Sequence, residues 1–191
     1  MPGRLWRPCL PSCPCNPLYQ PCIKCRNPAS EWVHSDHAPL RSFTFEFSLP
    51  ARLECVAALH RDTRALRWLT PPPIHVQLHY VEPLAENSRA EFTLWFGALP
   101  VRWEAVHSRV HPLCGFIDTQ RRGPMRYWRH THAFSALTAR TTRVCERIEY
   151  AHYPGGRGLL SRLLFNPLAL RLLFAYRRLA LQRTLRKQAD A

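Results

Sequence analysis

Two histidines, His130 and His132, stand two positions apart in a segment with the alternation of a β-strand. Side chains at that spacing point to one face of a sheet, about 7 Å apart. With Glu146 or Asp118 beside them, two imidazoles and a carboxylate could bind a metal ion. A histidine could instead act as a general acid or base, because imidazole titrates near neutral pH. We favour a third interpretation, in which these side chains are hydrogen-bonded anchors in a pocket wall.

The same alternation extends the candidate site to other strands. Residues that share the more apolar face with the two histidines are predicted to line the concave side of the sheet, unless a bulge shifts the register. Two residues of the C-terminal helix, Phe174 and Arg177, face the same space. The predicted ligand-binding residues are Trp103, Asp118, Gln120, Trp128, His130, His132, Glu146, Tyr150, Phe174 and Arg177. His130, His132 and Glu146 are also the candidate catalytic residues, although we favour a protein that is not an enzyme.

Arg177 interrupts an otherwise apolar stripe of the C-terminal helix. An arginine in that setting pairs with a carboxylate, extends its head group to water, or binds an anionic ligand group. We expect pairing with Glu146 or Asp118, with ligand binding as the alternative.

The elements that position these residues follow from the hydrophobic pattern. Residues 42–48 alternate strictly, which predicts a strand, and two short helices are expected at 51–60 and 62–69, ended by three prolines. Six further strands are predicted at 74–81, 90–96, 101–110, 115–120, 125–134 and 142–150. A helix is predicted from 159 to 187, kinked or divided at Pro167. Consecutive strands with short turns indicate an antiparallel meander.

This order of elements predicts an α+β fold. A curved antiparallel sheet of about seven strands must bury one face, and the C-terminal helix, about 42 Å long, is the only element able to cover it. A concave space between sheet and helix is a common place for an apolar pocket with a few polar groups.

Three stretches carry a resemblance to a known superfamily. They are Leu69-Thr-Pro-Pro-Pro73, the run from Asp118 to Phe134 that contains Gly-Pro-Met-Arg-Tyr-Trp-Arg-His-Thr-His, and Leu173-Phe-Ala-Tyr-Arg177. Over 42–186 the chain resembles the START-like helix-grip superfamily, also called SRPBCC or polyketide cyclase/dehydrase-like, and in particular its small bacterial ligand-binding members. It departs from their pattern at residues 138–142, where a Gly-Gly-Thr turn is usual.

The resemblance implies a function as well as a fold. It implies binding, transport or sequestration of a hydrophobic small molecule such as a lipid, an isoprenoid, a quinone (as in coenzyme Q-binding proteins) or a polyketide. The alternative is a cyclase or dehydratase that uses a pocket histidine on a polyketide-like substrate. Fold alone does not decide between them.

Residues 1–40 differ in composition from the rest, with many prolines and five cysteines. We expect an irregular extension, or a start of the native protein further along the chain, before a domain at 41–187 and a tail at 188–191. Zinc at Cys13, Cys15, Cys22 and Cys25 is an alternative, but the spacing departs from that of a structural zinc site. We therefore predict no metal and no cofactor.

The formal net charge is +14, which suggests an anionic partner. Nucleic acid is not favoured, because no recognised binding module is present. Between residues 157 and 187 there are eight basic residues and no acidic one, so the C-terminal helix could rest on an anionic membrane. No uninterrupted apolar run reaches about 18 residues, which argues against a membrane span. We expect a cytoplasmic protein, in peripheral contact with the inner membrane face if the helix binds lipid; a membrane-surface adaptor without a ligand is the third functional alternative.

Overall fold

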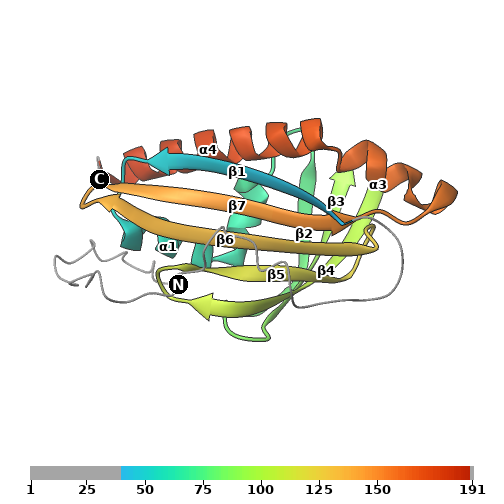
Figure 1. Ribbon diagram of the computed structural model, residues 1–191, viewed down its shortest axis with the longest axis horizontal. Coiled ribbons are helices and arrows are strands. Elements are labelled where there is room, and N and C mark those ends of the chain that lie inside the picture. The colour runs from blue at the N-terminus through green and yellow to red at the C-terminus, as the bar shows by residue number, and fades with distance from the viewer. Residues whose placement is uncertain (1–39, 190–191) are drawn as a thin grey trace, which may run out of the picture.

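In the computed structural model, which describes residues 40–189, the strands form one antiparallel sheet with the order β1-β7-β6-β5-β4-β3-β2 (Figure 1). The strands are β1 (Arg41–Leu49), β2 (His75–Val81), β3 (Arg89–Phe96), β4 (Leu99–His111), β5 (Gly115–Arg122), β6 (Tyr127–Thr138) and β7 (Thr141–Ala151). The helices are α1 (Leu53–Arg61), η1 (Thr63–Ala65), α2 (Leu66–Leu69), η2 (Gly155–Gly158), α3 (Leu159–Leu164) and α4 (Pro167–Ala189). The predicted extension at 1–40 and its four-cysteine zinc alternative fall, except for Leu40, outside the described residues.

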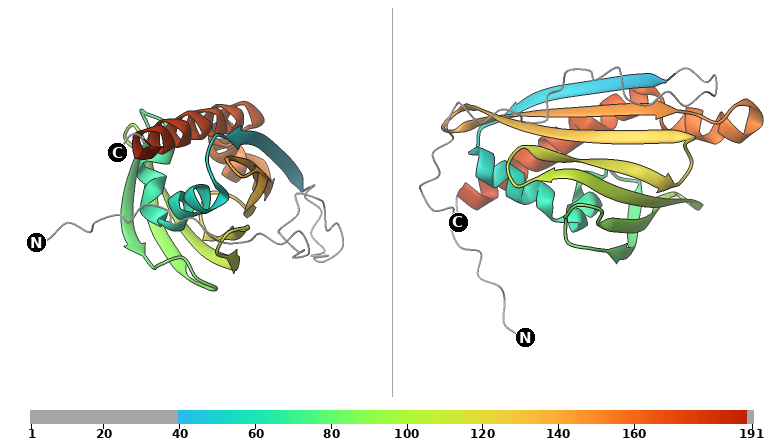
Figure 2. Two further views of the ribbon diagram at one scale, coloured as in Figure 1. Left: turned by 90° about the vertical axis from the view of Figure 1, so that its left-hand side faces the viewer. Right: turned by 60° about the horizontal axis from the view of Figure 1, so that its bottom comes forward.

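The sheet curves, and α4 lies across its open side, with α1 and α2 inside the curve (Figure 2). The inner face of α4 carries Leu170, Phe174 and Leu181, each at most 1% exposed. Phe174 stacks on Phe43 and Phe45 of β1, with ring centroids 5.8 Å and 6.1 Å apart. The predicted fold, a curved antiparallel sheet gripping a long C-terminal helix, is therefore confirmed.

Pro167 divides the C-terminal helix, because a proline removes a backbone donor from a helix interior but is well suited to a first turn. Asn166 begins the second helix, since its side-chain Oδ1 accepts a hydrogen bond from the Ala169 N–H at 2.9 Å. Taken together, Gly155–Gln188 is long and apolar enough to cross a membrane by length and composition alone. In this structure its inner face covers the sheet.

The short helices end where the sequence predicts. Asp62 caps η1, with its Oδ1 accepting from the Arg64 N–H at 2.9 Å, and the proline run follows α2 directly. The inner side of α1 presents Val56, Ala57 and His60 to the core.

The strand boundaries differ most at the β6–β7 hairpin, which extends to Thr138 and Thr141 rather than ending at 134 and 142. The added residues 135–138 are exposed, so they lack the apolar alternation that marks a half-buried strand. Backbone pairing with β7 holds them in the sheet.

Two apolar clusters fill the interior. One contains Trp103, Trp128 and Phe165, and the other contains Phe134, Leu181 and the inner face of α1. Trp128 and Phe134 approach two polar rings that lie between the clusters, those of His130 and His60. The fold thus places ionisable side chains in the middle of an apolar interior.

Candidate functional site

Four ionisable side chains meet on the concave face of three neighbouring strands. Asp118 lies on β5, His130 and His132 on β6, and Glu146 on β7. The register places Asp118 opposite His130 and His132 opposite Glu146. Since alternate residues share a face, the pairing of the strands alone brings the four together. We call them the histidine–carboxylate cluster.

Each carboxylate of the histidine–carboxylate cluster contacts both imidazoles. His130 Nε2 lies 2.7 Å from Glu146 Oε2, and its Nδ1 lies 3.2 Å from Asp118 Oδ2. His132 Nε2 lies 3.1 Å from Asp118 Oδ2, and its Nδ1 lies 2.9 Å from Glu146 Oε2. The two Nε2 contacts have hydrogen-bond geometry. His132 Nδ1 is buried without an aligned hydrogen-bond partner among the described residues.

This arrangement is short of positive charge when both imidazoles are neutral. Each neutral ring has one N–H, and the two aligned hydrogen bonds use both. The two Nδ1 lone pairs then face carboxylate oxygens, which is repulsive in an interior of low dielectric constant. A further proton or a bound cation relieves the repulsion.

The pKa values respond to these contacts. Burial disfavours the charged form of His132, but the Glu146 carboxylate and the contact with Asp118 outweigh it and raise the pKa of His132 to about 9. Burial also disfavours the carboxylates, yet the neighbouring imidazoles hold the pKa values of Asp118 and Glu146 below their usual range. In the absence of another cation, the histidine–carboxylate cluster therefore holds an extra proton at neutral pH.

Two further histidines border the histidine–carboxylate cluster. The Nδ1–H of His60 donates to the Val56 carbonyl at 2.8 Å, and its Nε2 lies 3.9 Å from Glu146 Oε1. Burial lowers the pKa of His60 to about 4. His107 lies 3.1 Å from the Ser88 carbonyl through Nδ1, and burial lowers its pKa as well. Both rings are neutral at pH 7.

A cavity of about 100 Å³ lies beside the histidine–carboxylate cluster, between the sheet and the α1–α2 segment. Its polar side is formed by His60, His107, Asp118, His130, His132 and Arg177. Its apolar side is formed by Leu66, Leu69, Ala90, Phe92, Ala105 and Phe116. Asp62, Thr63 and Ala65 of the η1 region complete the lining. An apolar wall thus faces a charged wall across a small space.

Arg177 reaches the cavity from α4. Its Nε–H donates to the Leu69 carbonyl at 3.3 Å, and its guanidinium lies 5.1 Å from the Phe174 ring centroid. The expected ion pair with Glu146 or Asp118 does not form within 4.0 Å in the described part of the chain, and these carboxylates act on Arg177 only at longer range. The backbone bond to Leu69 orients the guanidinium toward the cavity instead.

The predicted ligand-binding residues fall into two groups. Asp118, His130, His132 and Arg177 line the cavity; Trp103, Gln120, Trp128, Glu146, Tyr150 and Phe174 do not. The tryptophans lie edge to face at 5.3 Å and pack on Phe165. Tyr150 and Phe174 belong to the same apolar cluster. Gln120 is used in a turn, where its Nε2–H donates to the Met125 carbonyl at 2.8 Å.

His60 was not among the predicted residues, although it lines the cavity. Its signal in the sequence is helical spacing: Leu53, Val56 and His60 recur at the interval of one helix face and are all buried. A histidine in that stripe indicates a buried, hydrogen-bonded ring. The sequence does not tell which strand that helix face covers.

Comparison with known proteins shows the fold. No protein-family model and no curated protein match the sequence. The structure is similar to that of the Zhui aromatase/cyclase from Streptomyces sp. R1128, with a TM-score of 0.64 and 12% identity over 79% of this chain and 96% of that chain. It is similar to norcoclaurine synthase from Thalictrum flavum, solved with dopamine and hydroxybenzaldehyde, with a TM-score of 0.61 and 12% identity over 78% and 88%. The protein TTHA0849 from Thermus thermophilus gives 0.59 and 18% over 75% and 99%.

These likenesses, together with the sheet order and the gripping helix, define the class: the chain has the START-like, SRPBCC-type helix-grip fold. The resemblance seen in the sequence is confirmed at the level of the fold. At these identities the comparison leaves function to the site itself.

Proposed function

We propose that the protein binds a small hydrophobic molecule with an anionic or oxygen-rich end in the cavity between the sheet and the α1–α2 segment, for carriage or sequestration. The observation that supports this most directly is the two-sided lining of the cavity. Burial of the apolar part of a ligand on one side supplies affinity, and placed polar groups on the other side supply orientation.

Arg177 is the proposed contact for the anionic end. Only its Nε–H is hydrogen-bonded within the described residues, so its terminal N–H groups are available to a carboxylate, phenolate or phosphate. Hydrogen bonds to charged groups contribute about 1.5–3 kcal/mol each. His60 and His107, both neutral, add acceptors nearby.

The size of the cavity limits the occupant. Pockets for drug-sized ligands have about 300–1,000 Å³, whereas this cavity has about 100 Å³. A short chain or a single ring fits with little change. A lipid, isoprenoid or quinone requires the wall formed by η1 and the single-turn α2 to move outward.

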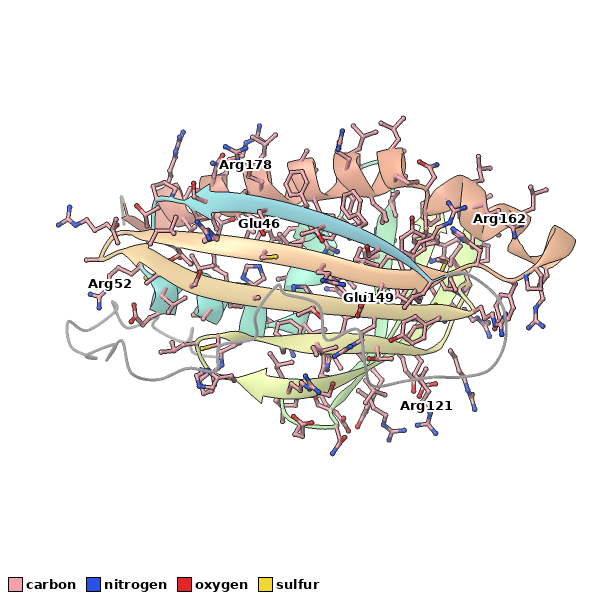
Figure 3. The ribbon with its side chains drawn as sticks, in the orientation of Figure 1. Glu46, Arg52, Arg121, Glu149, Arg162 and Arg178 are labelled. Carbon is pink, nitrogen blue, oxygen red and sulfur yellow. The ribbon has the colours of Figure 1, made fainter. Side chains whose placement is uncertain are left out.

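Matched ligands test the proposal. Hexanoate and 1-hexanol share an apolar chain and differ in the head group, and their binding to the full chain can be measured by NMR titration. We expect saturable binding with hexanoate about ten- to hundredfold tighter. Arg177→Met should remove this preference, and Arg178→Met, on the exposed side of α4 (Figure 3), should retain it. No saturable binding of either molecule would contradict the proposal, and a preference that survives in Arg177→Met would contradict the role of Arg177.

Acid–base catalysis by the histidine–carboxylate cluster is the second candidate, as a cyclase or dehydratase. Two imidazoles that each contact two carboxylates beside a cavity support it, because proton transfer needs such partners. Turnover of a polyketide-like substrate that is lost in His132→Gln while binding remains would favour this function. Equal product formation with and without the protein would exclude it for that substrate.

Membrane contact is the third candidate, and the outer face of α4 supports it. Leu168, Leu172 and Leu179, the outer leucines, are 67%, 62% and 50% exposed. They recur on one side of the helix, and basic residues such as Arg171 and Arg178 are exposed beside them. An apolar ridge with flanking arginines is typical of helices that lie in an anionic membrane surface.

A further inference from the structure

We propose that Asp118, His130 and His132 form a binding site for a divalent transition-metal ion, which Glu146 positions from behind. The ligand atoms of the three residues all lie within 4.8 Å of one another. Two histidines and one carboxylate form a well-known ligand set for such ions, and it leaves coordination positions open.

The contact distances fit a shared ion. Two ligand atoms that each lie about 2.1 Å from a metal are separated by roughly 3.0–3.4 Å at octahedral to tetrahedral angles. Asp118 Oδ2 lies 3.2 Å from His130 Nδ1 and 3.1 Å from His132 Nε2. One ion can therefore contact all three atoms with small side-chain rotations.

Glu146 has the place of an outer carboxylate. A metal-bound imidazole usually donates its other N–H to a carboxylate or carbonyl, which fixes the ring. His130 Nε2 donates to Glu146 Oε2 at 2.7 Å. When His132 binds through Nε2, its proton moves to Nδ1, which lies 2.9 Å from the same oxygen. This accounts for the buried Nδ1 that has no aligned partner in the described residues.

The position of the cavity distinguishes the two carboxylates. Asp118, His130 and His132 line it, and Glu146 does not. An ion at Asp118 is thus reached by water or by an oxygen of a bound molecule, whereas Glu146 is enclosed, with 2% of its surface exposed.

The charges and ligand types narrow the choice of ion. Asp118 and Glu146 carry two negative charges and Arg177 one positive charge at this end of the cavity, so a divalent cation gives a net charge of one positive unit. Imidazole ligands favour zinc, iron, cobalt or nickel over calcium and magnesium, which prefer all-oxygen sites. A carboxylate or enolate oxygen of the proposed organic ligand would complete the coordination, although the metal site itself does not depend on that ligand.

Cobalt(II) titration of the full chain tests the site with the metal alone. The parent protein should carry serine in place of the four cysteines that could bind metal by themselves, which are Cys13, Cys15, Cys22 and Cys25. After chelator treatment, we expect one Co²⁺ per chain and visible ligand-field bands without a sulfur-to-cobalt band. Zinc should displace the cobalt. A parent protein that takes up no Co²⁺ would overturn the proposal.

Variants locate the ion. Asp118→Asn and His132→Gln should weaken binding at least hundredfold, and Glu146→Gln about 10- to 100-fold. His107→Gln is the matched control, because His107 lines the same cavity but lies against Ser88; its affinity should be unchanged. Unaltered affinity in Asp118→Asn and His132→Gln would contradict the site.

If either variant fails to fold, the parent protein still gives a decision. Paramagnetic Co²⁺ should shift the ring protons of His130 and His132 in NMR spectra, and shifts confined to other histidines would overturn the proposal. Failure of the metal site would leave hexanoate binding unaffected, so the two proposals fail separately.

Discussion

Replacement of His60 by asparagine should change how the stability of the protein depends on pH. Burial lowers the pKa of His60 to about 4, from an ordinary value of 6.5. Below pH 6.5 the unfolded chain binds a proton at this residue while the folded chain does not, so acid favours unfolding. His60→Asn retains a side-chain N–H for the Val56 carbonyl but does not titrate.

The magnitude follows from the two pKa values. Between pH 7.5 and pH 5, His60 should reduce the free energy of unfolding by about 2 kcal/mol; the full effect, reached near pH 4, is about 3 kcal/mol. The contribution has the opposite sign to that of His132, whose raised pKa stabilises the fold below pH 6.5 and loses that effect as the pH rises toward 9. The difference between wild type and His60→Asn isolates the His60 contribution.

Urea unfolding at several pH values, with a chelator present, measures this difference. Relative to wild type, His60→Asn should gain about 2 kcal/mol on going from pH 7.5 to pH 5. Val56→Ala, on the same buried helix face, should lose a constant amount across that range. A pH-independent difference for His60→Asn, or one of opposite sign, would refute the reasoning.

Three further predictions concern other parts of the fold. Replacing the outer leucines together by serine should leave the urea midpoint nearly unchanged and abolish salt-sensitive sedimentation with phosphatidylglycerol vesicles; Leu99→Ser, an exposed leucine of β4, should not affect sedimentation, and wild type that stays in the supernatant would remove the membrane candidate. Gly115→Ala should cost about 3 kcal/mol or more, because Gly115 has φ +119° and a Cβ would lie 1.9 Å from the His132 carbonyl oxygen; Gly156→Ala, with nothing within 4 Å, should cost little, and equal costs would contradict this. Phe174→Ala should cost about 3–5 kcal/mol in urea unfolding, since Phe174 is fully buried; a loss below about 1 kcal/mol would mean that α4 does not hold the core.

The sequence predicts the fold well because each strand has a strict alternation and each break has turn residues. The same alternation brings Asp118, His130, His132 and Glu146 to one face. Their contact depends on a further fact, the register, which pairs Asp118 with His130 and His132 with Glu146. Register is set by the turns and bulges of the folded sheet, so the distances within the histidine–carboxylate cluster could not be predicted.

Packing explains the remaining differences. The inward direction of Trp103 and Trp128 follows from alternation, but the contact of both rings with Phe165 at the end of α3 depends on how the divided helix lies on the sheet. Those rings fill one end of the space, which leaves the small cavity at the other. Arg177 is similar: its place on the inner stripe is visible in the sequence, whereas its bond to the Leu69 carbonyl requires the position of α2.

Native mass spectrometry of the protein purified from its own host, followed by extraction of whatever it releases, tests ligand binding most directly. We expect one adduct per chain, with an apolar body and an acidic or oxygen-rich end. Its mass would also show whether the cavity opens beyond a single ring or short chain. A chain found only at its bare mass, under conditions that preserve added hexanoate as a complex, would contradict the binding of such a molecule in the cell.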